Sequence, residues 1–478
     1  MLMNPSRPAV ALAGAIVMLA GCQSYQPKPL DLASHRDMWS ARMPGDEPVR
    51  AFAERLAASG QPSVFDPSDG LSLAEGELVA LVYNPDLRLA RLRAGISAAT
   101  ADHAGLWDDP QLTVDFLQVT ESIPNPYFIT PGLAFTIPIS GRLDAEKERA
   151  DAVLAAELTR VAEVEWAVRI EVRQTWLRWS AAKMRAEQTE QLLASIESLV
   201  GSTSRLAEAG EMLQTEAALF TIERASQSRV LLKFRGDAAE VEQRLRSLLG
   251  VSPDAPLELQ STLVATTDFD QPTAGAAAER NLTLVRLRDE YEVAERTLYR
   301  EVRKQYPDLT IGPLADFDQG QTMLGFSLAL PIPILNANKQ GIAQAIAERE
   351  LARAAFETEY DRLVGSLAAT QVRIETLREQ RNLIESEIAP LVDRQLGDAQ
   401  RLLGLGEGEG LILLESLSRV GQTRMELIET RLAESLAESE LSHLLGPPAP
   451  SIETSENPTD QNATTAGHAG SRLPKVTP

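Results

Sequence analysis

The chain has 478 residues, of which 44% are hydrophobic and 24% charged, so it is long and apolar enough to bury a large core. Its formal net charge is −22, which argues against a nucleic-acid-binding protein because contacts to phosphate need a basic surface. The same charge fits either a soluble acidic surface or a lumen that tolerates cations. Aromatic residues make up only 5% of the chain, and the regions rich in Ala, Leu, Glu and Arg indicate helical bundles.

The N-terminus predicts export and lipidation. Residues 1–21 combine Arg7 with an apolar run that is too short to span a bilayer, which is typical of a secretory signal peptide. The run ends in Leu-Ala-Gly followed by Cys22, which resembles the lipoprotein box of bacteria and predicts acylation of that cysteine. Cys22 is the single cysteine, so a disulfide or a cysteine metal site is excluded. Gln23 after it favours delivery to the outer membrane, and residues 22–71 are predicted to be an acylated, mostly extended lead-in.

Residues 72–250 contain two short strands between helices. The segments 111–119 and 132–139 alternate apolar side chains with small or polar ones, which predicts strands with one apolar face. Asn84 before Pro85 predicts the cap and first position of a helix. After the strands, no proline occurs from Arg142 to about residue 209, which predicts a helix about 100 Å long. A return helix to residue 249 ends at glycine.

The second half repeats this plan over residues 278–446, after a linker predicted at 251–277. Strands are predicted at 308–316 and 323–332, and a long helix follows, with Pro390 predicting a kink. Spacing of four and three residues predicts a coiled-coil seam on that helix, along Leu363, Leu367, Thr370, Ile374, Leu377, Arg381, Ile384, Ile388 and Leu391. Residues 447–478 are polar and are predicted to be a disordered tail.

Three blocks of matching residues show that the two halves are an internal duplication. The offset is 197 positions in the first block, 193 in the second and 196 in the third. The matches are Asn84, Leu87, Arg91, Pro110, Leu112 and Thr113 with Asn281, Leu284, Arg288, Pro307, Leu309 and Thr310; Gly132, Pro138 and Ile139 with Gly325, Pro331 and Ile332; and Arg205, Leu206, Gly210, Glu211, Leu249 and Gly250 with Arg401, Leu402, Gly406, Glu407, Leu445 and Gly446.

The four strands have the length and pattern of tilted membrane strands. A sheet edge in a bilayer leaves backbone groups unpaired, so the sheet must close on itself. Four strands are too few, because membrane barrels need about eight or more. The chain is therefore expected to oligomerise: two copies supply eight strands and three copies supply twelve, of which only the larger barrel leaves a lumen.

The segments NPDLRLARLR, AGLWDDPQLTVDF, GLAFTIPISGRLDAE, PDLTIGP and GFSLALPIPILNANKQG resemble the outer-membrane efflux protein family, the TolC-like channels. The resemblance covers about residues 72–446. It implies a mainly α fold with a small membrane β-barrel portion: duplicated coiled-coil hairpins and four strands per chain, with a homotrimer forming a 12-stranded barrel and a periplasmic helical tunnel. It also implies a periplasmic adaptor and an inner-membrane pump as partners, most closely of the resistance-nodulation-division type, including metal-cation pumps.

In that family the two helix turns at the periplasmic end contact the adaptor. The matching residues are Gly210 and Glu211 in the first turn and Gly406 and Glu407 in the second. A tight turn alone also explains the two glycines, because glycine adopts positive φ without strain. The extra glycines around position 406 depart from the family and suggest a more pliable turn.

The family's gates use acidic residues just after the second turn. Glu415 matches one such position, whereas Ile412 occupies the other, which puts a double acidic ring in doubt. Glu407 and Glu409 are candidates to supply the negative charge that is missing at Ile412. Carboxylates that converge on a symmetry axis attract cations and raise one another's pKa. An ordinary solvated glutamate on a helix explains Glu415 equally well.

An enzyme is not expected, because the four histidines are scattered and no catalytic or cofactor motif is present. No cofactor or metal site is predicted. The preferred function is an exit duct that passively conducts small toxic compounds or metal cations. Two alternatives stay open: an outer-membrane channel for protein or polysaccharide secretion, and a non-conducting periplasmic coiled-coil adaptor or scaffold. The paired, duplicated strands favour a channel over an adaptor.

Overall fold

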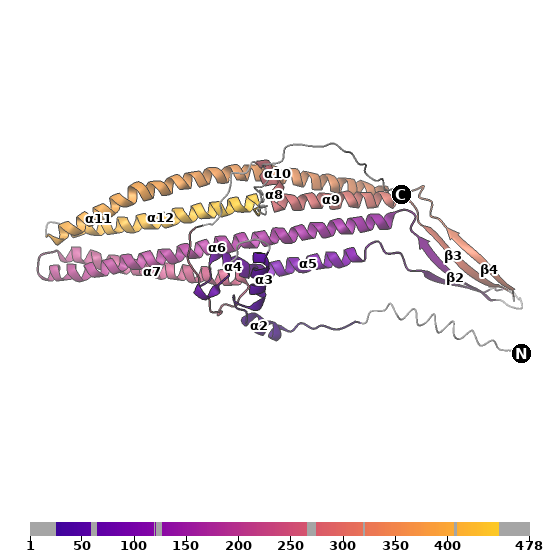
Figure 1. Ribbon diagram of the computed structural model, residues 1–478, viewed down its shortest axis with the longest axis horizontal. Helices are drawn as coiled ribbons and strands as arrows, with labels where there is room; N and C mark the ends of the chain where they lie inside the picture. The colour runs from indigo at the N-terminus through magenta and orange to yellow at the C-terminus, as the bar shows by residue number, and fades with distance from the viewer. Residues whose placement is uncertain are drawn as a thin grey trace, which may run out of the picture.

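A computed structural model of the protein shows an elongated molecule with its strands at one end and two helix turns at the other (Figure 1). A small group of short helices lies near the middle, against the long helices. The structure describes residues 25–58, 65–118, 120, 127–264, 274–318, 321–405 and 409–448. The predicted signal peptide and most of the predicted tail lie outside these residues.

Most of the described chain is helical. No described helix has both the length and the apolarity that a membrane crossing requires. The helices are α2 (Leu32–Ser40), α3 (Glu47–Ala58), α4 (Leu73–Tyr83), α5 (Pro85–Asp102), α6 (Arg142–Glu208), α7 (Gln214–Leu249), α8 (Ala274–Arg280), α9 (Leu282–Arg303), α10 (Lys339–Leu383), α11 (Ala389–Gly404) and α12 (Gly410–Leu445), with a short 3₁₀ turn at Pro67–Asp69.

The duplication is visible as the same contacts made twice. Asn84 caps α5 by accepting from the backbone N–H groups of residues 86 and 87, and Asn281 caps α9 by accepting from that of Leu284. Each asparagine also donates its side-chain amide to a carbonyl near the end of a return helix, Leu248 O or Leu444 O, at 2.9 Å in both cases. These buried bonds tie the start of each repeat to its end.

The two glycines that end the return helices are required by close packing. Gly250 and Gly446 have φ of 72° and 75°. A Cβ atom on Gly250 would lie 2.2 Å from the Tyr83 carbonyl oxygen, and one on Gly446 would lie 2.1 Å from that of Arg280. Only glycine tolerates both the left-handed backbone and this approach, so each return helix can end directly against the α5 or α9 turn.

The largest hydrophobic core lies in the first repeat, where α4, α6 and α7 meet. Trp176 on α6 is fully buried there, and its indole N–H donates to the Gln260 carbonyl at 2.9 Å. Val251, Ala255, Leu257 and Leu259 pack into this core, and Leu71 forms a parallel bridge with Leu259. The described part of the predicted linker is thus anchored mainly to the first repeat, and near its end the Leu263 carbonyl accepts from the Ser435 hydroxyl on α12 of the second repeat.

The long helix of the second repeat is interrupted where the kink is expected. A π-helical turn at Ile384–Ile388 separates α10 from α11, and Pro390 lies in the first turn of α11. A π turn adds one residue to the helix and so rotates the following side chains. The predicted seam is correct as far as Ile384, but Leu391 is wrong: it is 59% exposed, whereas the next residue, Val392, is 8% exposed.

The four strands form one antiparallel sheet in the order β1-β2-β3-β4. The strands are β1 (Gln111–Gln118), β2 (Tyr127–Ile137), β3 (Leu309–Asp318) and β4 (Gln321–Ala329). β2 begins five residues before the predicted segment 132–139, so part of the predicted loop is strand. β1 and β4 are the two edges, and both are exposed along their whole length.

Candidate functional site

The pairing register places the apolar side chains of all four strands on one face of the sheet. Leu112 on β1 lies opposite Leu133 on β2, Phe135 lies opposite Ile311 on β3, and Ile311 lies opposite Leu328 on β4. Because directly opposite residues point to the same side, the alternating sets predicted from sequence combine into one surface. Its edge-strand members are highly exposed: Leu112, Val114, Phe116, Leu324, Phe326 and Leu328.

The opposite face of the sheet carries mostly small and polar side chains, with Leu117, Phe128, Leu314 and Met323 as the large apolar exceptions. Thr130 donates its hydroxyl to Asp316 at 3.0 Å, and Thr136 lies 3.4 Å from Thr310. Gly312 faces the same side, and a Cβ atom there would clash with the Leu133 carbonyl oxygen at 1.6 Å. The sheet therefore has one face suited to lipid and one suited to water.

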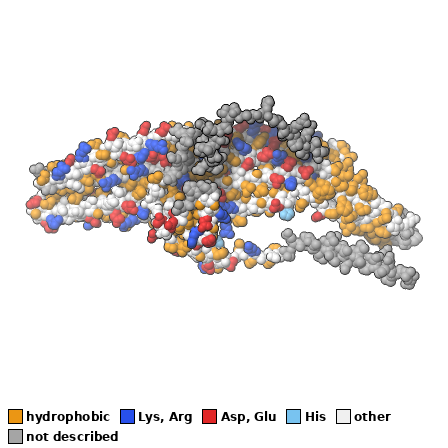
Figure 2. Space-filling view, in the orientation of Figure 1, with side chains coloured by type: hydrophobic (Ala, Val, Ile, Leu, Met, Phe, Trp, Pro, Cys, Tyr) orange, Lys and Arg blue, Asp and Glu red, His pale blue; other side chains and the backbone are white. Residues whose placement is uncertain are grey.

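Exposed aromatic residues mark both ends of the sheet. Trp107 and Tyr306 precede β1 and β3 at the end nearest the helices, and are 65% and 57% exposed. Tyr127 and Phe317 lie at the far end and are 52% and 45% exposed. Figure 2 shows hydrophobic side chains gathered over the strands, in contrast to the mixed charges over the helices. Aromatic rows at both borders of an apolar band are typical of membrane barrels.

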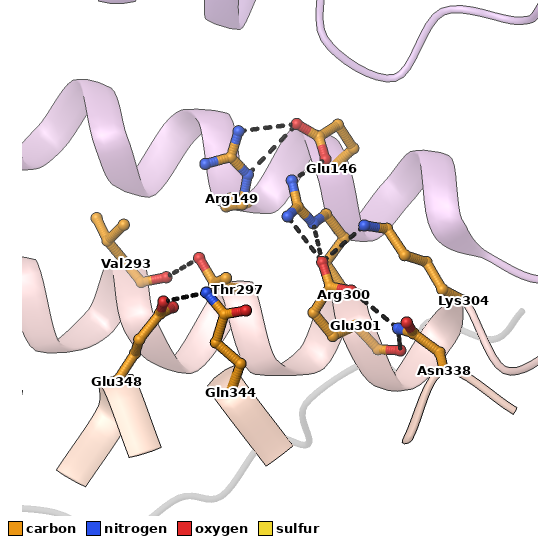
Figure 3. Close-up of polar contacts among 10 residues, drawn as sticks. All are labelled: Glu146, Arg149, Val293, Thr297, Arg300, Glu301, Lys304, Asn338, Gln344 and Glu348. Atoms are coloured by element: carbon orange, nitrogen blue, oxygen red, sulfur yellow. Dashed lines mark hydrogen bonds and ion pairs between the residues drawn. The ribbon is translucent and has the colours of Figure 1, made fainter. Parts of the chain in front are cut away.

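A polar network holds the helices together where they approach the sheet (Figure 3). Glu301 on α9 accepts from Arg300, from Lys304 and from Asn338, the residue that precedes α10. Burial disfavours the charged carboxylate, but the three donors outweigh it and hold the pKa of Glu301 at about 2. Arg300 also binds Glu146 on α6, at 2.9 Å. Sequence reasoning missed this network; the only signal was Asn338 immediately before a long helix.

A second anchor fixes the start of α6. Asp308, which precedes β3, accepts from the Ser140 hydroxyl at 2.6 Å and from the Arg142 guanidinium. Arg142 also pairs with Asp108. Burial opposes the charged form of Asp308, but the bonds from Ser140 and Arg142 hold its pKa below the ordinary value. These residues link both hairpins of the sheet to the first long helix.

At the other end of the molecule, Gly210 closes the turn between α6 and α7. It has φ of 79°, its N–H donates to Ala207 O at 3.2 Å, and the N–H of Glu211 donates to Leu206 O at 2.9 Å. This is the Schellman arrangement that ends helices at glycine. A Cβ atom on Gly210 would meet nothing within 4 Å, so the turn is open to solvent.

The second turn joins α11 to α12 beside the first. Gly406 and Glu407 lie outside the described residues. Glu409 is exposed and precedes α12 without a side-chain capping bond. Gly410 is buried: a Cβ atom there would lie 3.1 Å from Met212 Cε and 3.4 Å from Phe220 on α7. The two turns are therefore packed against each other.

Glu415, the gate candidate, lies on the exposed side of α12. Its side chain is 63% exposed and pairs with Arg419, one helical turn later, at 2.9 Å. Ile412, one turn before it, is 50% exposed. The structure thus places Ile412, Glu415 and Arg419 on one uncovered stripe. Within a single chain the carboxylate has a cationic partner, which the sequence analysis did not foresee.

Comparison with solved structures identifies the fold, whereas no protein-family model and no curated protein matches the sequence. The outer-membrane protein VceC from Vibrio cholerae matches with a TM-score of 0.66 at 17% identity, over 78% of this chain and 96% of its own. CusC, described as forming a transmembrane channel, matches with a TM-score of 0.68 at 17% identity, over 89% of this chain and 100% of its own. The outer-membrane channel OprN matches with a TM-score of 0.69 at 14% identity, over 89% of this chain and 98% of its own.

The chain has the fold of outer-membrane channels. The expected fold class, long duplicated helical hairpins with a small four-stranded sheet, is confirmed. CusC and OprN, which share it, are described as channels, in agreement with the expectation from sequence that the protein is not an enzyme.

Proposed function

We propose that this protein is the outer-membrane channel of a tripartite efflux system and passively conducts small toxic compounds or metal cations to the outside. The observation that carries this proposal is the sheet, with one apolar face, one polar face and two unpaired edges. A sheet of this kind is stable in a bilayer only when its edges are paired, which requires further copies of the chain.

Three copies supply twelve strands in the proposed homotrimer. Strands of 8 to 11 residues rise about 3.3 Å per residue and match the apolar band of about 25 Å in a membrane barrel once they tilt. The polar sheet face then lines the lumen. The solved structures with this fold are described as outer-membrane channels, which supports the same assignment.

The helices supply the periplasmic part of the duct, and α6 alone, at 67 residues, extends about 100 Å. At its far end the two packed turns expose apolar side chains: Leu213, Leu405, Leu411 and Ile412. An apolar surface on a turn favours protein contact. The proposed partners are a periplasmic adaptor, which binds Gly210, Glu211, Gly406 and Glu407, and an inner-membrane pump. Acylation of Cys22 anchors the chain to the outer membrane.

The proposed gate is the stripe of Ile412, Glu415 and Arg419, repeated in each copy at the end of the duct that carries the two helix turns. Single-channel conductance of the purified protein in planar bilayers tests both function and gate. We expect small, cation-selective steps. Substitution Glu415→Gln reduces cation selectivity by removing a carboxylate from the constriction, whereas Glu292→Gln, which removes a similarly exposed carboxylate paired with Arg296 at 2.6 Å on α9, leaves selectivity unchanged.

Three results separate the claims. If Glu415→Gln leaves the conductance steps and their cation selectivity unchanged, the protein is a channel but Glu415 is not its gate residue. Equal losses in both variants assign selectivity to overall charge instead. No conductance from a folded, membrane-inserted preparation, with or without an added adaptor, rejects the channel and favours a scaffold.

A further inference from the structure

Apolar side chains are highly exposed where the chain leaves β4 and turns toward α10. Leu330, Ile332, Ile334 and Leu335 are 49%, 74%, 81% and 91% exposed. We call residues 330–335 the β4–α10 loop. A cluster of apolar side chains is unfavourable in water, so this one indicates a contact that a single chain does not supply.

The β4–α10 loop extends the apolar face of the sheet beyond the last paired residue. Leu324, Phe326 and Leu328 lie on that face of β4, and Leu330 continues their alternation after β4 ends at Ala329. A second copy that pairs with the free edge of β4 lies in the plane of the sheet, so it leaves the outward face uncovered. The surroundings of the apolar face therefore reach the loop as well.

The loop also lies at a border between apolar and charged surface. It is at the end of the sheet nearest the helices, as are the exposed rings of Trp107 and Tyr306. No charged residue occurs from position 319 to 338, and the exposed Lys339 ends this run. In Figure 2 hydrophobic side chains cover the strands up to the ends of the helices. Aromatic rings and a cation beside an apolar run are typical of the border between lipid and water.

The first repeat contains a shorter form of the same junction. After β2, the Ile139 N–H donates to Ile137 O at 2.9 Å, and the corresponding bond of the second repeat joins Ile334 N–H to Ile332 O, also at 2.9 Å. Each of these three-residue turns is centred on a proline. Two residues separate the turn from α6, whereas four separate it from α10. The junction of the second repeat is therefore two residues longer.

The longer junction directs an apolar side chain outward. In the first repeat the residue after the turn is Ser140, which is buried and donates to Asp308 at 2.6 Å. In the second repeat the residue after the turn is Leu335, which is 91% exposed. A polar side chain would be more soluble at this position, so a leucine there indicates a specific apolar contact.

The backbone after the loop is held in an unfavourable conformation. Ala337 and Asn338 have φ of 46° and 52°, in the left-handed region that side chains with a Cβ atom rarely adopt. The Asn338 amide donates to Glu301 O at 2.9 Å and to Glu301 Oε2 at 2.8 Å, as Figure 3 shows. The Lys339 N–H donates to Asn336 O at 3.0 Å. The end of α9 thus fixes the direction of the loop, and a protein keeps such strain where a fixed geometry has a use.

We propose that the β4–α10 loop inserts into the lipid at the border of the outer membrane nearest the helices, and that the bonds between Asn338 and Glu301 hold it there. Ile334 and Leu335 enter the apolar layer, and Lys339 stays among the headgroups. One loop from each copy fixes the depth of the barrel in the membrane and resists a pull along its axis. This inference rests on the proposed function for the membrane, and it adds a lipid contact outside the strands.

Depth-dependent fluorescence quenching tests the lipid contact in the full-length, assembled protein. A nitrobenzoxadiazole probe is attached through Leu335→Cys in vesicles of phosphatidylethanolamine and phosphatidylglycerol, which carry a doxyl quencher either near the headgroup or deep in the acyl chain. We expect the shallow quencher to act several-fold more strongly on this probe than on one at Leu232→Cys, an exposed position of α7. The parent chain, treated in the same way, gives the background from Cys22.

The matched positive control is a probe at Leu324→Cys. Leu324 lies near the middle of β4 on the apolar face and is 85% exposed. We expect this probe to be quenched mainly by the deep quencher, because the strand crosses the apolar layer. Comparison of the two positions shows whether Leu335 lies in lipid at the border.

A second variant tests the hold on the loop. Asn338→Gly permits the left-handed backbone but removes both bonds to Glu301. We expect it to lower shallow quenching at Leu335 about twofold, because a released loop divides its population between lipid and water, while quenching at Leu324 is unchanged. Asn336→Gly controls for added flexibility, since the exposed Asn336 side chain makes no hydrogen bond within the described chain.

The outcomes separate this inference from the proposed function. Shallow quenching at Leu335 that falls in Asn338→Gly but not in Asn336→Gly supports the inference. If the Leu335 probe is shielded from water but quenched by neither lipid, another part of the protein covers it, and the inference is overturned. A Leu335 probe that behaves like the Leu232 probe overturns it as well.

Quenching at Leu324 in either of these cases keeps the membrane barrel. Equal quenching at Leu335 with and without Asn338→Gly rejects the role of Asn338 and Glu301. Absence of quenching at Leu324, together with absence of conductance, rejects the proposed function itself.

Discussion

The two repeats share a topology but differ in what covers their long helices. α6 in the first repeat buries side chains along its length, from Ala145 to Ala207. α10 in the second buries Ala345 and otherwise only the residues of its seam from Leu363 to Ile374. The middle helices and residues 251–264 pack on α6 and have few counterparts on α10. The first repeat is thus the scaffold within one chain, and the second leaves its surfaces for other contacts.

The largest expected effect tests this difference in burial. Trp176→Ala removes a fully buried indole from the main core and its bond to Gln260. We expect a loss of about 3–5 kcal/mol in the free energy of unfolding. Leu367→Ala, in the smaller core of the second repeat, is expected to cost about 2 kcal/mol, the lower end for a buried leucine. Denaturant titration followed by far-UV circular dichroism measures both.

A larger loss from Leu367→Ala than from Trp176→Ala would contradict the assignment of the first repeat as the scaffold. Leu232→Ala serves as the control, because this leucine on α7 is 71% exposed. Its substitution is expected to change the free energy of unfolding by less than about 0.5 kcal/mol.

The second prediction uses a polar difference between the repeats. Glu301 precedes the end of α9, whereas Ala104 occupies the corresponding position of the first repeat. The folded-state pKa of Glu301, about 2, lies below the ordinary 4.5. The unfolded chain therefore binds the proton first as pH falls, so this carboxylate stabilises the fold fully above about pH 4.5 and loses its effect toward pH 2.

We expect Glu301→Gln to lower the free energy of unfolding by about 1–2 kcal/mol at pH 7, since it removes the charge from bonds with Arg300, Lys304 and Asn338. The difference from the parent protein shrinks between pH 4.5 and 2. Glu348→Gln is the matched control, because Glu348 is exposed and accepts from Gln344 on its own helix. A constant difference across this pH range would show that the carboxylate acts through packing alone.

The smallest effect tests the π turn, which has no counterpart in the uninterrupted α6. Val392→Ala is expected to lower the free energy of unfolding by about 1 kcal/mol, because Val392 is buried after the turn shifts the seam. Leu391→Ala, the position favoured by the uninterrupted seven-residue pattern, is expected to change it by less than about 0.5 kcal/mol. A larger loss from Leu391→Ala than from Val392→Ala would show that the seam follows the uninterrupted seven-residue pattern through Leu391.

Local patterns predicted much of the fold because they are set by neighbouring residues. Alternation identified the strands, and the absence of proline from Arg142 onward set the length of α6. The exit of Leu391 from the seam could not be predicted, since the π turn depends on packing between helices. The partner of Glu415 is four residues away and was visible in the sequence, but the network around Glu301 joins α6, α9 and Asn338, the residue before α10. Contacts of that kind require the tertiary arrangement.

Placing two repeats on one polypeptide has a kinetic and energetic consequence. The α6–α9 contact forms between segments that are tethered, so it meets its partner at a high effective concentration and tolerates polar side chains. A contact between separate molecules must also offset the loss of translational and rotational freedom. A tethered contact can therefore be polar, as it is where Arg160 on α6 pairs with Glu290 on α9 and Glu163 on α6 pairs with Arg286 on α9.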